Sequence, residues 1–209
     1  MCKETFLRLP EEKRTRFLDA AWEEFTHVSF AEASVNQIVR RAGVPRGSFY
    51  QYFEGKEDLF AHLQSMIWRH FVKEYGAVLE QEDGDIFRTQ LHCFDRFVRE
   101  GGEFADRMFE RCVKILRMNA GLNLQVIAID KVSEVMLAGV REKIDVTAFR
   151  RKETEFVEQV FLMTLMALAG AVMDSLLHPE LAAERQRELE TRMDIIKNGS
   201  LTGCGHENG

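Results

Sequence analysis

The sequence predicts an all-α protein with an N-terminal three-helix helix-turn-helix domain and a C-terminal helical bundle, dimeric through a four-helix interface. Apolar residues recur at the 3.6-residue spacing of helices, and no stretch shows the two-residue alternation of a half-buried strand. Only 3 of the 209 residues are proline, which also favours helices. This length suffices for one small domain followed by a larger one.

The composition, with 45% hydrophobic and 30% charged residues, is that of an ordinary globular protein. A net charge of −6 argues against a general coat for nucleic acid. The opening residues lack an apolar core of signal-peptide length, so we expect a cytoplasmic protein. The four cysteines, Cys2, Cys93, Cys112 and Cys204, show neither paired nor metal-ligand spacing. We therefore expect reduced thiols, with Cys112 more often a buried structural residue than a redox sensor.

A first long helix is predicted from about Pro10 to about Thr26. Proline is favoured in the first turn of a helix, and Glu11 and Glu12 suit the positive end of the helix dipole. An apolar stripe at helical spacing would cover the back of the two short helices that follow. Its members are Phe17, Leu18, Ala21, Trp22 and Phe25.

The stretch from Ser34 to Lys56 predicts two short helices joined by a tight turn. Ser34 followed by Gln37 has the spacing of a capping box, so the first helix should begin at the next residue, Val35. Gly43 should end that helix, because glycine enters the left-handed region at no steric cost. Proline at the following turn cannot donate a backbone hydrogen bond, which suits a position between helices.

The second short helix, about Arg46 to Phe53, has an unusual outward face. Phe49 and Phe53 are four residues apart and share the inward side. The outward side carries a guanidinium, a glycine, a hydroxyl and two phenols, which are groups that reach phosphates and base edges of DNA. We predict base-edge contacts for Arg46, Ser48 and Tyr50, close approach at Gly47, and phosphate contacts for Ser34, Asn36, Tyr52 and Lys56. The alternatives are a solvated helix face and, for Tyr52, a ring packed on the first helix.

The run AGVPRGSFYQYFEGKEDLF resembles the DNA-binding domain of the TetR family of bacterial transcriptional regulators. Its glycine, the small-aromatic-Tyr step, the Tyr-Phe pair and the lysine that opens the next helix fall at that family's spacing. The resemblance covers about the first 60 residues, and the rest matches only in being helical and of suitable length. It implies a repressor that a small apolar or aromatic effector, bound in the C-terminal domain, releases from a palindromic operator.

Six longer helices are expected after the helix-turn-helix. The first, from Gly55 to about Leu79, should connect the two domains, and a polar loop follows at 81–85. The other helices are expected at about 86–99, 103–118, 124–143, 151–177 and 180–197. An effector pocket would be lined by Trp68, Phe71, Phe94 and Phe109. Aromatic residues at helical spacing are more often plain core, which is the alternative.

The helix at 151–177 contains the apolar run VFLMTLMALAGAVM, in which Thr164 is the only polar side chain. Such a helix should be buried on every side. A run of fourteen residues is too short for a bilayer, which needs about twenty, so no membrane partner is expected. Paired with the last helix it would form a two-fold symmetric four-helix interface. The predicted interface residues are Phe161, Thr164, Ala167, Leu168, Ala171, Leu189, Met193 and Ile196.

These expectations divide the chain into three parts: a helix-turn-helix DNA-binding domain at 1–55, a ligand-binding and dimerisation domain at 56–198, and a disordered tail at 199–209. The predicted partners are double-stranded DNA with a palindromic operator, a second copy of the chain and a small-molecule effector. We find no nucleophile with a base and an orienting group and no clustered metal ligands, so we expect no catalytic residue, metal or cofactor. The alternative is an all-helical dimer with an enzymatic or purely structural role.

Overall fold

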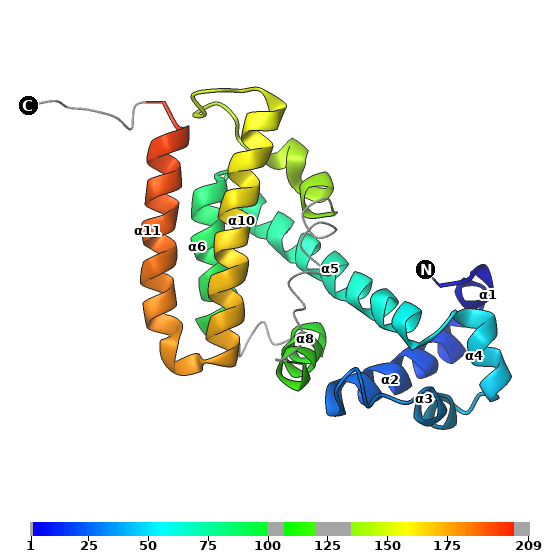
Figure 1. The fold of residues 1–209 in the computed structure, drawn as a ribbon. Coiled ribbons are helices and arrows are strands. Elements are labelled where there is room, and N and C mark those ends of the chain that lie inside the picture. The colour runs from blue at the N-terminus through cyan, green and yellow to red at the C-terminus, as the bar shows by residue number, and fades with distance from the viewer. Residues whose placement is uncertain (1, 100–106, 120–134, 203–209) are drawn as a thin grey trace, which may run out of the picture. The chain divides into compact units, whose positions relative to one another are not determined.

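The protein is described by a computed structural model that covers residues 2–99, 107–119 and 135–202 (Figure 1). It confirms the all-α fold, since the described residues form helices and one isolated bridge, between Phe149 and Leu201. The elements are α1 (Glu4–Leu7), α2 (Glu11–His27), α3 (Val35–Ala42), α4 (Arg46–Tyr52), α5 (Lys56–Gln81), α6 (Ile86–Phe94), the π-helical η1 (Asp95–Arg99), α8 (Arg107–Met118), the 3-10 turn η2 (Arg141–Lys143), α10 (Thr154–Leu177), the 3-10 turn η3 (Pro179–Leu181) and α11 (Ala182–Ser200).

The chain divides into two compact units. Unit 1 takes its described residues from 1–69 and 106–124, and unit 2 takes its described residues from 70–105 and 125–209. The division falls within α5 and gives α8 to unit 1. The compact units therefore differ from the predicted domains at 1–55 and 56–198, which stay a prediction about function.

Unit 1 has a core of aromatic side chains. Phe17 of α2 stacks on Phe53 at a ring-centroid distance of 5.9 Å, and Phe6 of α1 lies 4.8 Å from the same ring. Phe49 is also fully buried, which confirms the predicted inward side of α4. Aromatic pairs contribute about 0.5–1.5 kcal/mol each beyond the area that they bury. Because these rings come from three helices, they hold α4 firmly against α2.

Within unit 1, α8 packs on α2. Arg111 donates a hydrogen bond to Asp19, with 2.7 Å between Nη2 and Oδ1, and its guanidinium lies 4.8 Å from the centroid of the Trp22 ring. The side chain of Asn119 accepts a hydrogen bond of 2.9 Å from the backbone N–H of Phe30. An element far along the sequence thus supports the helix on which the short helices rest.

Unit 2 contains α6, α10 and α11, which pack against one another (Figure 1). A polar cluster lies inside it: the Gln90 amide donates to the hydroxyl oxygens of Tyr75 at 3.1 Å and Thr164 at 3.0 Å. All three residues are 1% exposed or less. The Thr164 hydroxyl in turn donates to the carbonyl oxygen of Phe161 at 2.8 Å. Thr164, the one polar residue of the apolar run, is therefore an internal hydrogen-bonding residue.

The structure corrects the predicted dimer interface. Six of the eight residues are at most 4% exposed inside unit 2, so they belong to the core of a single chain. They are Phe161, Thr164, Leu168, Ala171, Leu189 and Met193. Ala167 and Ile196 are partly exposed. The prediction failed because α10 is apolar on every side, so its sequence pattern does not show which side faces inward.

The same helix corrects a second expectation. The run of fourteen residues was too short to cross a bilayer, whereas α10 has 24 residues and is long and apolar enough by length and composition. One such helix is weak evidence for a membrane span, because the core helix of a soluble protein passes the same test. The length argument against a bilayer is therefore wrong, because it counted only the apolar run and not the whole helix.

The ends of the chain also differ from expectation. The sequence analysis did not predict α1, whose four residues are too few for a periodic pattern. Gly199 and Ser200 belong to α11, and Leu201 pairs with Phe149, so residues 199–202 are not the start of a disordered tail. Residues 203–209, residues 124–134 of the helix predicted at 124–143 and the start of the helix predicted at 103–118 lie outside the described residues.

Two cysteine thiols have raised pKa values. Burial raises the pKa of the Cys93 thiol to about 12, and burial also raises the pKa of the Cys112 thiol to about 12, although Cys112 as a whole residue is partly exposed. Thiolates rather than thiols react, and a raised pKa keeps both side chains as thiols at neutral pH. This supports a structural role for Cys112 rather than a role as a redox sensor.

Candidate nucleic-acid interface

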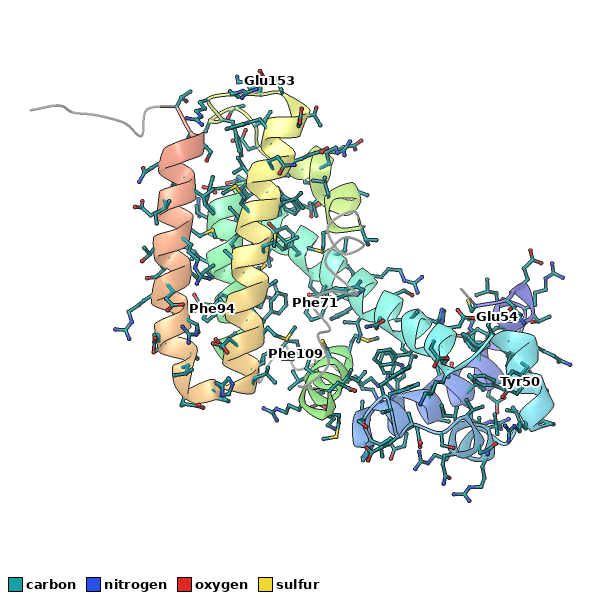
Figure 2. All side chains as sticks on the ribbon, viewed as in Figure 1. Tyr50, Glu54, Phe71, Phe94, Phe109 and Glu153 are labelled. Atoms are coloured by element: carbon teal, nitrogen blue, oxygen red, sulfur yellow. The ribbon has the colours of Figure 1, made fainter. Side chains whose placement is uncertain are left out.

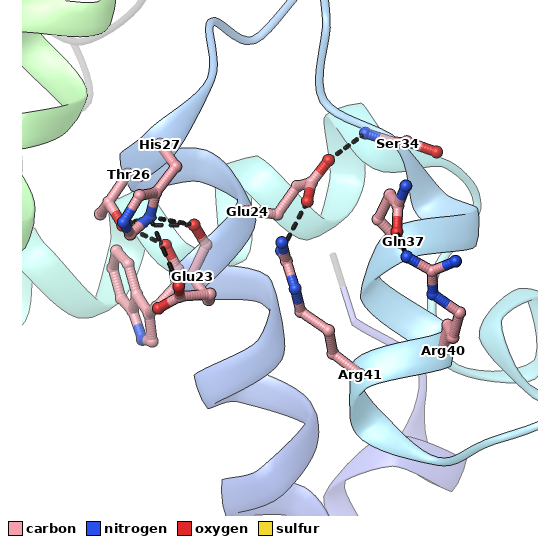
Figure 3. A network of polar contacts seen from close by, with 9 residues as sticks. Glu23, Glu24, Thr26, His27, Ser34, Gln37, Arg40 and Arg41 are labelled. Carbon is pink, nitrogen blue, oxygen red and sulfur yellow. Dashed lines mark hydrogen bonds and ion pairs between the residues drawn. The ribbon is translucent and has the colours of Figure 1, made fainter.

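The start of α3 is fixed by Glu24 of α2, as Figure 3 shows. One carboxylate oxygen of Glu24 accepts the backbone N–H of Ser34 at 2.9 Å, and the other accepts a hydrogen bond from Arg41 at 2.7 Å. The predicted capping box is wrong: the Ser34 side chain makes no cap bond, and Gln37 accepts from Arg40 instead. Glu24, on a neighbouring helix, accepts the hydrogen bond from Ser34 that the Gln37 side chain was expected to accept.

The turn between α3 and α4 has the predicted geometry. Gly43 adopts the left-handed conformation with φ of 65°. Its N–H donates to the carbonyl of Arg40 at 3.3 Å, and the N–H of Val44 donates to the carbonyl of Val39 at 3.0 Å. These two bonds form a Schellman motif, which satisfies carbonyls at the end of a helix. Pro45 then leads directly into α4.

The outward face of α4 carries the residues that were predicted to contact bases. Arg46 and Gly47 are exposed at its first turn, Ser48 is half-buried, and Tyr50 is 46% exposed (Figure 2). A Cβ atom added to Gly47 would meet nothing within 4 Å, so the glycine is not required by packing inside the protein. On α3, Asn36 is also exposed, and Ser34 is half-buried.

The charge of this surface is positive. Between Val35 and Phe53 the chain has three arginines, Arg40, Arg41 and Arg46, and no acidic residue. Arg41 is paired with Glu24 across α2 and α3, whereas Arg40 and Arg46 are exposed. Exposed guanidinium groups at this surface can bind phosphate oxygens or the edge of guanine.

The ring of Tyr52 packs on the first long helix, which is the alternative expected for this residue. Its ring lies 5.7 Å from the rings of Phe6 and Phe17, between α1 and α2. The residue is half-buried, so only part of its side chain reaches solvent. Its ring therefore holds α4 in place, and a phosphate contact by its hydroxyl stays a prediction.

Lys56 is engaged within the protein. Its Nζ donates to the carbonyl oxygens of Phe30 at 2.7 Å, Ala31 at 3.0 Å and Ala33 at 3.2 Å, and it lies 4.9 Å from the centroid of the Phe30 ring. A lysine ammonium has three donors, and three carbonyls accept them. The geometry thus gives Lys56 the task of holding the loop between α2 and α3, which argues against its predicted phosphate contact.

Sequence reasoning missed Glu24 as a positioning residue. Glu24 lies on the inward stripe of α2, three residues after Ala21 and next to Phe25, and it is 5% exposed. An acidic residue at an inward position is a signal for a buried pair, because a buried charge is costly unless it is paired. That signal was present in the sequence.

The four residues of the predicted effector pocket fall in both units. Trp68 and Phe109 belong to unit 1, and Phe71 and Phe94 belong to unit 2. In unit 2, Phe94 is fully buried, and Phe71 lies 5.3 Å from the ring of Phe97. The pocket therefore stays a prediction.

Residues 17–63 match the family model described as bacterial regulatory proteins of the tetR family. This segment is a TetR-family DNA-binding domain. The match begins within α2 and ends within α5, so it includes both short helices and the turn between them. The family assignment therefore rests on the same surface that the geometry singles out.

Relatives of this chain support the same fold. The uncharacterized HTH-type transcriptional regulator YdgC of Bacillus subtilis is 48% identical over 52 residues, which are 25% of this chain and 27% of YdgC. The chain thus matches only about a quarter of that relative's length. SmeT, the repressor of the Stenotrophomonas maltophilia multidrug efflux pump SmeDEF, has a TM-score of 0.56 at 19% identity, over 98% of this chain and 96% of SmeT. A SmeT complex with triclosan gives a TM-score of 0.56 at 20% identity, over 95% of this chain and 97% of that chain.

Proposed function

We propose that this protein is a transcriptional regulator of the repressor class that binds operator DNA through α3 and α4. The observation that carries the proposal is the exposed face of α4, a helix without acidic residues on which Arg46 and Tyr50 reach solvent. A helix-turn-helix places its second helix in the major groove, with the N-terminal residues of that helix at the base edges. Arg46 is the first residue of α4.

The proposed contacts follow from position and chemistry. Arg46, Ser48 and Tyr50 contact base edges, and Gly47 allows the DNA to approach the helix backbone closely. Ser34, Asn36 and the Tyr52 hydroxyl contact phosphates. Lys56 is left out of this set because its ammonium group is bound by three carbonyls.

The protein is proposed to act as a homodimer on a palindromic operator. The support is three exposed apolar side chains of unit 2, which differ from the residues predicted from the sequence. Met163 and Met166 on α10 are each 55% exposed, and Ile195 on α11 is 65% exposed. Exposed apolar groups on neighbouring helices mark interaction surfaces, and α10 and α11 pack side by side.

An effector bound in the C-terminal helices is the third part of the proposal. SmeT binds triclosan, a small aromatic molecule, and it shares the fold of this chain. The proposed effector is of the same apolar or aromatic class, bound among the helices of unit 2 near Phe71 and Phe94. The protein is proposed to work in the cytoplasm without catalysis, cofactor or metal.

Selection of random duplex DNA by the purified protein tests the proposal. Enrichment of a palindrome is the expected result, and enrichment of no sequence would contradict the regulator function. It would instead favour a helical dimer with an enzymatic or structural role.

The arginine at the start of α4 provides the sharper test. Arg46→Ala should weaken binding to the enriched palindrome by about 1–3 kcal/mol and relax the preference at one base pair of each half-site. Arg40, which is exposed on α3, is proposed to contact a phosphate, so Arg40→Ala should weaken all sequences alike and lower the slope of log affinity against log salt by about one. Arg187→Ala, which alters an exposed arginine of α11, is the control and should change neither quantity. Equal behaviour of the Arg46 and Arg40 variants would contradict the division of roles.

A further inference from the structure

The last turn of α4 ends on carbonyl groups that need partners from outside the helix. The last four carbonyls of any α-helix lack partners within it. Here the carbonyl of Phe49 accepts the N–H of Phe53 at 2.9 Å, but the next three belong to Tyr50, Gln51 and Tyr52. These three all lie in the helix that carries the proposed base contacts.

Residues 3–5 at the N-terminus supply the three missing donors. Lys3 Nζ donates to the carbonyl of Tyr50 at 2.9 Å, and the backbone N–H of Lys3 donates to the carbonyl of Tyr52 at 2.9 Å. The Thr5 hydroxyl donates to the carbonyl of Gln51. Every carbonyl of the last turn of α4 is thus satisfied, three of them by Lys3 and Thr5.

Two further contacts hold this N-terminal segment in place. Phe6 is fully buried, with its ring 4.8 Å from that of Phe53 and 5.7 Å from that of Tyr52. The Lys3 ammonium also pairs with Glu54 at 3.0 Å, just beyond α4. A positive charge at this end suits the negative end of the helix dipole. Figure 1 shows α1 beside the end of α4.

A helix of seven residues is far too short to be stable by itself. Its end must be ordered either by the rest of the protein or by the DNA when it binds. If the protein itself orders the end of α4, DNA binding does not have to supply the free energy for that ordering, and the affinity for DNA is higher. Lys3 therefore helps to fix the position of Tyr50, because its ammonium group donates a hydrogen bond to the Tyr50 carbonyl.

We propose that Lys3 and Thr5 are positioning residues for DNA recognition, which hold the end of α4 in its binding conformation without touching DNA. The inference rests on the proposed function of α4. It assigns a role to a segment that lies outside the residues 17–63 of the family match.

The test uses the full chain with Lys3→Met and Thr5→Val, singly and together. The controls are Lys73→Met, which removes an exposed lysine of α5, and Thr15→Val, which removes an exposed threonine of α2. Affinity for the enriched palindrome is measured by fluorescence anisotropy at several salt concentrations, at a temperature where each variant is folded by circular dichroism. Amide hydrogen exchange is followed in peptides that cover residues 46–54.

Each single variant should lose roughly threefold to tenfold in affinity, as expected for one hydrogen bond. The salt slope should stay unchanged, and exchange should become faster in residues 46–54 while the rest of unit 1 is unaltered. Lys3→Arg should restore most of the affinity, and both controls should match the unmodified chain.

Two results would overturn the inference. One is an affinity and an exchange rate equal to those of the controls in the double variant. The other is a salt slope that falls by about one in Lys3→Met, because the ammonium would then contact a phosphate directly. If the unmodified chain enriches no palindrome, the proposed function fails instead, and the exchange measurement still decides whether residues 3–5 order α4.

Discussion

At the scale of single residues, Glu24 sets the position of α3. Its carboxylate is buried and joins the N–H of Ser34 to the guanidinium of Arg41, so it connects α2 to both ends of α3. Breaking a buried pair is costly because it leaves a polar group without its partner. Arg41 is partly exposed and can be solvated, which reduces that cost.

Glu24→Leu should therefore destabilise the protein by about 1–3 kcal/mol, mostly through the unsatisfied N–H of Ser34. Glu24→Gln keeps an acceptor and should cost less. Glu23→Leu is a matched control, since Glu23 is the next residue on α2 and its side chain is 56% exposed. Urea unfolding measures all three variants. An equal loss of stability for the Glu23 and Glu24 variants would refute this account of Glu24.

We expect His62 to make the stability of unit 1 depend on pH. Its ring lies 5.7 Å from those of Phe6 and Phe53. Burial lowers the pKa of His62 below its ordinary value of 6.5, and the charge of Arg69 adds to the effect, while Asp58 opposes it. The unfolded chain therefore binds a proton at a higher pH than the folded chain, and stability is lost as pH falls from about 6.5 through the folded pKa.

His62→Gln should flatten the fall in urea midpoint between about pH 7.5 and about pH 5. His178→Gln, which alters an exposed histidine, should leave that fall as it is. A pH profile of His62→Gln that matches the unmodified chain would show that other groups cause the acid sensitivity.

At the scale of elements, the turn between α3 and α4 depends on one glycine. Gly43 has φ of 65°, and an added Cβ would meet nothing within 4 Å, so the cost of a side chain lies in the backbone alone. Gly43→Ala should destabilise the protein by about 1–2 kcal/mol. Gly47→Ala is the matched comparison, because Gly47 also has open space but lies inside α4.

Alanine at position 47 should raise stability by up to about 1 kcal/mol, since alanine favours helices. It should nevertheless weaken operator binding if DNA approaches the helix backbone there. Thermal unfolding and anisotropy titration of the two variants separate these effects. Loss of stability in both variants would contradict the open space at Gly47.

Helix ends that are set by a nearby glycine or proline could be predicted from the sequence. The bounds of α3 agree with the prediction because Gly43 gives a strong stop signal, and α4 begins at Arg46 as expected from Pro45. The partners of Ser34 and Lys56 could not be predicted, since Glu24 and the carbonyls at 30–33 reach them only in the folded chain. α1 was missed for a related reason, because its few residues are ordered by α4.

At the scale of the whole molecule, hydrophobicity alone did not show which face of α10 is exposed. α10 is apolar on all sides, so its sequence is equally consistent with either face inward. The structure buries Phe161 and Leu168 within unit 2 and exposes Met163 and Met166. A small polar signal existed in Thr164, because a lone hydroxyl in an apolar run needs a partner, and Gln90 provides it.

The exposed apolar face of α10 and α11 leads to the last prediction, on oligomeric state. Met163→Glu combined with Met166→Glu would place two charges from each chain within the proposed interface, where burial of an unpaired charge is very costly. The variant should be monomeric by sedimentation velocity, with a dimer dissociation constant raised at least about tenfold. Val146→Glu, at another exposed apolar residue of unit 2, is the control and should remain dimeric.

Operator binding should follow the oligomeric state. Two linked recognition helices bind a palindrome far more tightly than one, because the second contact forms at a high effective concentration. The double variant should therefore lose affinity for the full palindrome, while its weak affinity for a single half-site stays unchanged. Unaltered dimerisation of the double variant would place the interface on another surface. Loss of half-site binding as well would indicate that the substitutions disturb the fold.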